Sequence, residues 1–139
     1  MRSIGTGKLG LAAVLGTAAL ITAATATFAP GAAADGTVGN SNGAASVDWK
    51  TSGNYFTVHD LKPDGKATMG IIAVMDEYSG RYDYYVDYVY NRKGYDGPAV
   101  TKQFAQTQIY NGAWIRYQAC LSSLEGEPYS CGSWKYDRA

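Results

Sequence analysis

The sequence predicts an all-β fold, a small antiparallel β-sandwich of six to seven strands with one hairpin disulfide. From Ser46 onward, short runs of β-branched and aromatic residues alternate with turn-forming residues, at the spacing of about 8–12 residues that is typical of sandwiches. No stretch of this part has the apolar spacing of a helix. Cys120 and Cys131 are eleven positions apart with a turn between them, which suits the two arms of a hairpin.

The first 34 residues are predicted to be a secretory signal peptide that is removed on export. Arg2 and Lys8 form a basic start, an uncharged apolar run follows, and an A-x-A site ends at Ala34. We place cleavage after Ala34, with Ala26 and Ala29 as the weaker alternatives.

An uncleaved membrane anchor is the competing interpretation of this segment, because about 20 apolar residues suffice to span a bilayer. Gly and Thr residues within the run, and Pro30 beside the small-residue site, argue against it. We therefore expect a secreted protein that has no membrane segment after cleavage.

The charge balance limits the classes of partner. The chain has 12 Lys and Arg and 12 Asp and Glu residues; loss of Arg2 and Lys8 leaves 10 against 12, a net charge of −2. A surface so close to neutral gives no electrostatic reason to expect binding to nucleic acid or anionic lipid. We expect a monomer without a cofactor.

Residues 35–45 are rich in Gly, Asn and Ser without apolar periodicity, so they are predicted to form a flexible leader before a single β-domain, residues 46–139. A disulfide between Cys120 and Cys131 is expected in an exported chain, where it contributes roughly 3 kcal/mol on the chain-entropy model. A structural zinc site is the rival interpretation, but two cysteines and His59 cannot complete its four ligands.

The strands are expected within the following ranges, of which the fifth is weakly alternating and is predicted to lie at an edge: Ser46–Lys50, Tyr55–Asp60, Ala67–Glu77, Tyr82–Tyr90, Val100–Tyr110, Ala113–Leu121 and Tyr129–Tyr136. Because side chains alternate along a strand, Ile115 and Tyr117 should face opposite to Trp114 and Arg116. Ile115 and Trp134 are expected in the core.

Two segments carry a family resemblance. The sequence HDLKPDG, which follows Tyr55 closely, and the sequence YQACL…YSCGSW resemble small exported β-domain proteins of filamentous actinobacteria, most of which lack an assigned function. The resemblance covers most of residues 35–139. It implies an exported disulfide domain, and it brings no catalytic residues to transfer.

Candidate catalytic groups are weakly supported. His59 is the only histidine, and Asp60 beside it should point to the opposite face of the strand. No nucleophile motif accompanies it, although a triad assembled in space is not excluded by the sequence. Asp83 and Asp87 share a strand face roughly 13 Å apart, too far for the about 5–9.5 Å of a glycosidase pair.

The turn after the second predicted strand invites a calcium interpretation. Asp60 and Asp64 bracket it, but the full Asp-rich loop spacing with its terminal Glu is absent. Asp side chains in turns commonly bond to their own backbone instead. We therefore expect neither a metal site nor an enzyme.

Tyrosine is unusually frequent, with 12 residues, and four of them share a face of the strand Tyr82–Tyr90. Core packing is one interpretation, but four hydroxyl groups in a row are costly to satisfy inside a small domain. A half-exposed binding surface is the other, since Tyr gives contact area at a low cost in conformational entropy. The candidate binding residues are Tyr82, Tyr84, Tyr88, Tyr90, Trp114 and Arg116.

These features favour a non-catalytic extracellular binding module that recognises cell-wall or environmental polysaccharide, or a secreted protein, through surface aromatic residues. The alternative is a small secreted inhibitor of a hydrolase, or an antagonist of competitors. Its contacts would come from the charged loop 91–98, because loops on a rigid scaffold commonly carry such contacts.

Overall fold

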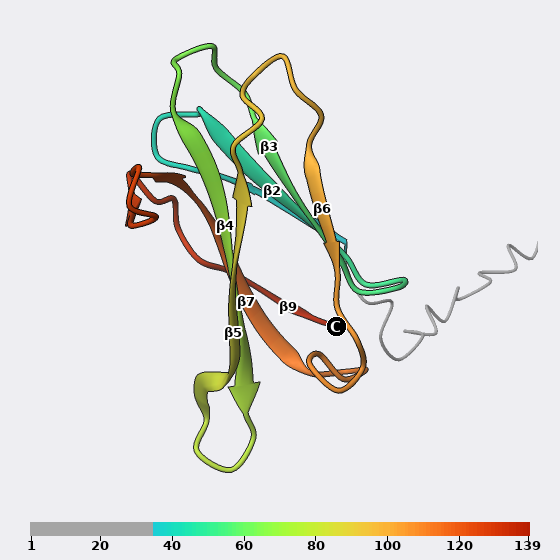
Figure 1. Ribbon diagram of the computed structural model, residues 1–139. Helices are drawn as coiled ribbons and strands as arrows, with labels where there is room; N and C mark the ends of the chain where they lie inside the picture. The colour runs from blue at the N-terminus through green and yellow to red at the C-terminus, as the bar shows by residue number, and fades with distance from the viewer. Residues whose placement is uncertain (1–34) are drawn as a thin grey trace, which may run out of the picture.

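The computed structural model describes residues 35–139 as two antiparallel sheets packed face to face (Figure 1). Sheet A has the order β1-β2-β3-β6 and consists of β1 (Gly36–Gly39), β2 (Ala45–Lys50), β3 (Tyr55–Asp60) and β6 (Val100–Gln103). Sheet B has the order β5-β4-β7-β8, with β9 also paired to β7, and consists of β4 (Ala67–Asp76), β5 (Arg81–Asn91), β7 (Trp114–Ser122), β8 (Pro128–Tyr129) and β9 (Lys135–Arg138).

The predicted all-β sandwich with one disulfide is therefore confirmed, although the described residues form nine strands rather than six to seven. None of the described residues forms a helix. The predicted signal peptide, residues 1–34, lies outside the described residues.

No helix long and apolar enough to cross a membrane occurs in the part of the chain that the structure describes.

The prediction of a flexible leader at residues 35–45 was wrong. Residues 36–39 form β1, which pairs with β2 through Val38 and Val47. The turn that follows is held by Asn40, whose Oδ1 accepts hydrogen bonds from the backbone N–H groups of Ala44 and Ala45 at 2.8 and 2.9 Å. A short polar side chain thus supplies the order that the lack of apolar periodicity concealed.

The C-terminal segment was predicted as one strand, Tyr129–Tyr136, but forms two short ones, β8 and β9. Leu121 pairs with Tyr129, so an unbroken register would place Ser130 opposite Cys120. Ser130 instead adopts a left-handed backbone conformation, with φ 48°, and the next N–H to pair comes from Gly132. This extra residue brings Cys131 to Cys120, and the predicted disulfide is confirmed.

The core lies between the sheets and is built from inward-facing residues of both. Trp49, Phe56, Ile115 and Tyr117 are among its largest side chains, each at most 1% exposed. Gly70, in the middle of β4, lets sheet A approach closely, because a Cβ atom there would lie 2.5 Å from the Phe56 ring. The alternation predicted along β7, with Ile115 and Tyr117 inside, is confirmed.

The predicted edge strand at 100–110 is shorter than expected but does lie at an edge. Only Val100–Gln103 forms β6, which pairs with β3 at the end of sheet A. The chain then turns inward, so Phe104 and Ile109 are buried in the core. The buried side chain of Asn54 ties this turn to sheet A by donating from Nδ2 to the carbonyl of Ile109 at 2.7 Å.

Candidate functional site

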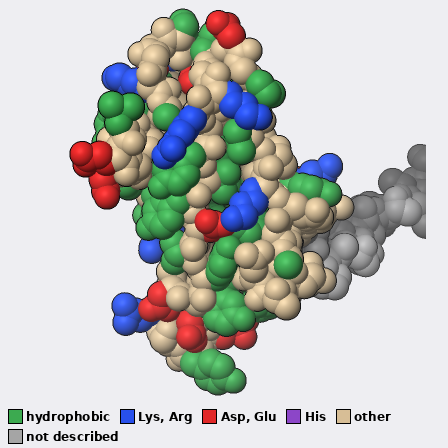
Figure 2. All heavy atoms as spheres, viewed as in Figure 1, with side chains coloured by type: hydrophobic (Ala, Val, Ile, Leu, Met, Phe, Trp, Pro, Cys, Tyr) green, Lys and Arg blue, Asp and Glu red, His purple; other side chains and the backbone are tan. Residues whose placement is uncertain are grey.

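The face of sheet B that points away from sheet A carries most of the candidate binding residues. On β5 it presents Tyr88 and Tyr90, and on β7 it presents Trp114 and Arg116. In Figure 2, hydrophobic side chains extend along the length of the molecule, with Lys and Arg side chains beside them towards the upper end. We call the following set the aromatic face: Tyr82, Tyr88, Tyr90, Trp114, Arg116, Trp134 and Tyr136.

Arg116 lies at the centre of the aromatic face between two aromatic rings. Its guanidinium carbon is 4.8 Å from the ring centre of Tyr82 and 4.3 Å from that of Trp134. No carboxylate among the described residues lies within 4.0 Å of it, and its Nε is buried without a hydrogen-bond partner. The rings therefore hold a cation in a fixed orientation without neutralising it.

Two further arginines lie on aromatic rings at either end of the aromatic face. The guanidinium of Arg138 is 3.8 Å from the ring centre of Trp114, and that of Arg92 is 5.0 Å from the ring centre of Tyr90. Neither arginine forms an ion pair within the described residues. Three arginines, one on β7, one on β9 and one just after β5, thus present guanidinium groups that are positioned by aromatic contact.

The side chains of Tyr82 and Tyr84 pack in different places, contrary to the prediction that they share one face. The pairing of β4 with β5 shifts between Val74 and Asp76. Beyond this irregularity the Tyr82 ring packs edge-on against Tyr136 at 5.6 Å. Tyr84 instead packs against Tyr110, at the margin of the core, so it lies apart from the Arg116 cluster.

Trp134 was expected in the core, and this expectation was wrong. The residue is half-buried and covers a small satellite cluster that includes Met69, Ile71 and the disulfide. The cause is the segment between β8 and β9, which the Cys120–Cys131 bridge holds against the aromatic face. Local alternation does not reveal this position, because Trp134 lies outside any strand.

Sequence reasoning also missed Tyr136, Arg138 and Arg92. Tyr136 is 55% exposed and Tyr88 is 47% exposed, so both rings are accessible on the aromatic face. The pairing of β7 with β9 places Tyr136 beside Arg116 and Arg138 beside Trp114. A strand assigned at 135–138, rather than one ending at Tyr136, would have indicated both neighbours.

A shallow hollow of about 340 Å³ opens beside Tyr82 and Arg116. Arg81 and Asp83 also line it and form an exposed ion pair with each other at 3.1 Å. Burial raises the pKa of Tyr82 above its ordinary value, Tyr136 adds to this effect, and Arg116 partly opposes it. The hollow therefore offers a neutral hydroxyl, cationic donors and a carboxylate acceptor to one ligand group.

His59 has a partner that the sequence did not indicate. Its Nε2 lies 2.7 Å from Oδ2 of Asp48 on the neighbouring strand, and Thr37 donates to the other oxygen of Asp48 at 2.6 Å. Ser46 is opposite His59 in the register, yet their side chains form no hydrogen bond with each other. This cluster lies on sheet A, on the other side of the core from the aromatic face.

The two carboxylates of the turn after β3 bond to the local backbone. Asp60 and Asp64 accept hydrogen bonds from the backbone N–H groups of Lys62 and Lys66, at 3.2 and 2.9 Å, which confirms the turn interpretation of these residues. Burial raises the pKa of Asp60, the bond from Lys62 lowers it, and Asp64 raises it. Among residues 35–139, no three His, Cys, Asp or Glu side chains are grouped so that they could hold a metal ion.

Comparison of the chain with protein-family models, with curated proteins and with solved structures found no match in any of the three. The likeness to exported actinobacterial proteins therefore stays a prediction, and the functional argument rests on the aromatic face itself.

Proposed function

We propose that this protein is a secreted, non-catalytic binding module that recognises polysaccharide through the aromatic face. The observation that carries the proposal is Arg116, held between the rings of Tyr82 and Trp134 without a carboxylate partner. A cation fixed in this way is ready to donate hydrogen bonds to a ligand without first reordering, which lowers the entropic cost of binding.

The exposed rings beside Arg116 supply the other half of a sugar-binding surface. Tyr88 and Tyr136 offer flat apolar area, and each loses little conformational entropy because only two side-chain torsions are fixed. The hollow beside Tyr82 adds donors and an acceptor that match sugar hydroxyl groups. Aromatic planes interleaved with such polar groups suit a chain of sugar rings better than a uniformly apolar surface would.

Two features of the chain support the proposed extracellular location. The predicted signal peptide would direct export, and a disulfide persists in the oxidising environment outside the cell. The disulfide-bonded domain of residues 35–139 would then present the aromatic face to extracellular polymers.

The experiment is co-sedimentation of residues 35–139 with insoluble chitin, cellulose and bacterial cell wall, at low and high salt. Salt-resistant retention on one polymer supports stacking on the aromatic face, because apolar contacts survive when charges are screened. Retention on none of the three polymers, together with no binding of a soluble neutral or acidic polysaccharide, contradicts the proposal.

The matched variants are Tyr88→Ala and Tyr78→Ala. Tyr88 lies on the aromatic face, whereas Tyr78 is fully exposed in the turn between β4 and β5. Tyr88→Ala should weaken retention about tenfold with little change in melting temperature, and Tyr78→Ala should leave retention unchanged. Equal effects of the two variants would place binding elsewhere on the molecule.

A second candidate function, inhibition of a foreign hydrolase, is favoured by the loop between β5 and β6. Tyr95 is exposed on it, and the buried side chain of Asn91 holds its base by donating to the carbonyl of Val58 and accepting from the N–H of Lys93. A rigid base with an exposed aromatic side chain suits insertion into a cleft. Replacement of residues 92–98 by Gly-Ser should abolish inhibition, if this function holds, while melting stays nearly unchanged.

A further inference from the structure

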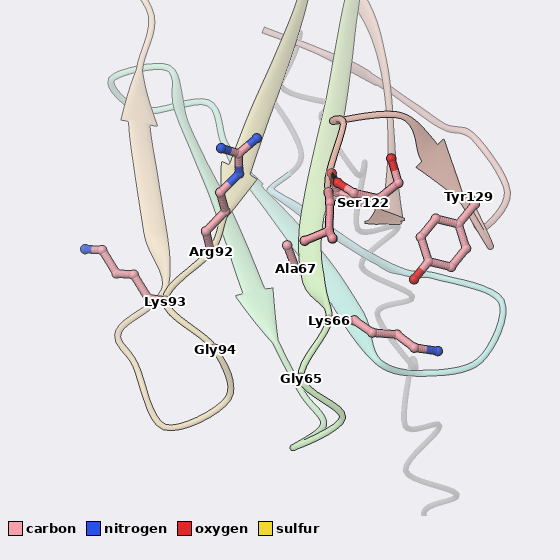
Figure 3. Close-up of a pocket in the computed structure, with 10 residues that line it drawn as sticks. Gly65, Lys66, Ala67, Arg92, Lys93, Gly94, Ser122 and Tyr129 are labelled. Atoms are coloured by element: carbon pink, nitrogen blue, oxygen red, sulfur yellow. Dashed lines mark hydrogen bonds between the residues drawn. The ribbon is translucent and has the colours of Figure 1, made fainter.

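A cleft of about 660 Å³ lies at one end of sheet B, where β4 begins and β5 and β7 end (Figure 3). Arg92 lies above Ala67 in this view, while Lys66 and Lys93 extend to opposite sides and Tyr129 faces the cleft from β8. The cleft is formed by three chain segments that are far apart in the sequence and are joined by the pairing of sheet B.

The charges that line the cleft have one sign. Lys66, Arg92 and Lys93 contribute three cations, and no carboxylate lines it. None of the three forms an ion pair within 4.0 Å among the described residues. Glu125 and Glu127, on the adjacent turn, are exposed and do not line the cleft. Uncompensated cations on both sides of a concave site favour an anionic ligand group.

Arg92 is the cation best placed to contact such a group. Its guanidinium rests on the ring of Tyr90 at 5.0 Å, and the Tyr90 hydroxyl donates to the carbonyl of Gly126 at 3.2 Å. The hydrogen bond to Gly126 orients the Tyr90 ring, and the contact with this ring orients the Arg92 guanidinium. A guanidinium offers two parallel N–H groups, which match the paired oxygens of carboxylate or sulfate.

The cleft continues the aromatic face. Met69 pairs with Tyr90 on one side and with Cys120 on the other, and all three side chains belong to the satellite cluster on that face. Two residues from Met69, Tyr90 and Cys120 along the chain are Ala67, Arg92 and Ser122, which line the cleft. Because side chains alternate along a strand, Ala67 and Ser122 point to the same side of the sheet as Met69 and Cys120. Arg92, just after β5, lies over the Tyr90 ring, so one extended ligand can contact both regions.

We propose that the cleft binds an acidic substituent, carboxylate or sulfate, of an anionic polysaccharide whose chain lies along the aromatic face. The proposal rests on the proposed polysaccharide-binding function and names its ligand class. An acidic protein segment is less well matched, because Arg116 on β7, Arg138 on β9 and Arg92 just after β5 are spread along one face of sheet B. Such spacing suits a polymer with regularly repeated acidic groups.

The test uses polymers that differ only in charge. Binding of residues 35–139 is measured by isothermal titration calorimetry with polygalacturonate and its methyl-esterified form, and with dextran sulfate and dextran. The first pair tests a carboxylate as the recognised group and the second pair tests a sulfate. Poly-glutamate represents an acidic protein segment. Each titration is repeated at high salt, where charge-dependent binding weakens.

Three variants locate the binding group. Arg92→Gln removes the cation, whereas Arg92→Lys keeps the charge but loses the paired N–H groups. Lys50→Gln makes the same charge change at an exposed position on sheet A, away from the cleft. We expect Arg92→Gln to weaken binding of an acidic polysaccharide about tenfold, because it removes a charge-assisted hydrogen bond. The affinity of Arg92→Lys for the acidic polysaccharide should lie between those of the unmodified protein and Arg92→Gln. Lys50→Gln should bind as tightly as the unmodified protein. Binding of the uncharged polymers should not depend on Arg92.

The outcomes separate this inference from the proposed function. Equal binding of charged and uncharged polymers, with no effect of Arg92→Gln, overturns the cleft as an acidic-group site and leaves polysaccharide binding standing. Binding to no polysaccharide of either kind overturns both. Tighter binding of poly-glutamate than of the acidic polysaccharides, lost in Arg92→Gln, overturns the ligand class and assigns the cleft to acidic protein.

Discussion

Asp87 on β5 and Lys102 on β6 form an ion pair that joins the edge strands of the two sheets. Oδ2 of Asp87 also accepts a hydrogen bond from the Tyr85 hydroxyl at 3.1 Å, and that hydroxyl in turn accepts from Nε2 of Gln108 at 2.8 Å. The Asp87 side chain is only 19% exposed. This side of the sandwich is therefore closed by a polar network rather than by backbone pairing.

Replacement of Asp87 should destabilise the domain. Asp87→Ala is expected to lower the free energy of unfolding by about 1–3 kcal/mol, because Lys102 and Tyr85 both lose their acceptor. Asp83→Ala, on the same strand, should change it by less than about 0.5 kcal/mol, since the Arg81–Asp83 pair is exposed. Urea denaturation measures both values, and equal losses would contradict a structural role for the network.

Gly36 tests whether residues 35–45 belong to the folded domain. A Cβ atom there would lie 2.1 Å from the hydroxyl oxygen of Tyr117, which is fully buried. We expect Gly36→Ala to cost about 1–3 kcal/mol of unfolding free energy through overpacking. Gly39→Ala is the control in the same strand, because its Cβ would make an ordinary 3.6 Å contact with the carbonyl of Ala45. A leader without structure would tolerate both changes alike.

The backbone at Ser130 predicts opposite effects for two substitutions. Its φ of 48° is accessible to glycine without steric cost and is unfavourable for a β-branched residue. Ser130→Val should therefore be less stable than Ser130→Gly by about 1–2 kcal/mol. Thermal denaturation of the oxidised proteins measures the difference. A stability of Ser130→Val equal to that of Ser130→Gly would show that this conformation is not required to bring Cys131 to Cys120.

Stability should fall at alkaline pH because of Tyr117. Its hydroxyl is buried and donates to Oδ2 of Asp137 at 3.2 Å; burial, followed by the charge of Asp137, raises the pKa of Tyr117 far above its ordinary value of 10.0. Above about pH 10 the unfolded chain releases this proton and the folded chain retains it. The contribution of Tyr117 is therefore complete below that pH and is lost above it, at up to about 1.4 kcal/mol per pH unit.

Chemical denaturation between about pH 9 and pH 11 measures this slope. The variant Tyr117→Phe should be less steep, although Tyr82, Tyr85 and Tyr110 also have raised pKa values and keep part of the dependence. An unchanged slope in Tyr117→Phe would mean that Tyr117 ionises as readily in the folded protein as in the unfolded chain.

Residues inside regular strands were predictable from the sequence. Alternation along β7 placed Ile115 and Tyr117 in the core and Trp114 and Arg116 outside, as the structure has them. The physical reason is that a strand with one buried face imposes a two-residue period on its side chains. The fold class and the disulfide followed from the same local information.

The features that sequence did not predict depend on contacts between distant segments. Asn40 orders residues that have no apolar pattern, through hydrogen bonds that composition does not specify. The position of Trp134 follows from the disulfide, and that of Tyr84 from a shift in strand pairing. The partner of His59 is Asp48, which required the register of β2 against β3. The aromatic face was thus only partly predictable.

The order of strands in sheet B also determines how the chain reaches its folded state. β4 pairs with β5 through a short turn, but its other neighbour is β7, where the register joins Ala67 to Ser122. This pairing closes a long loop that contains β5, β6 and the segments between them, and closing it costs conformational entropy. Folding that depends on such distant pairing is slow, in the range of about milliseconds to seconds. During this interval one edge of the apolar strand β4 stays open to other chains. Protein concentration during refolding, more than the stability of the finished domain, should then decide how much native protein is recovered.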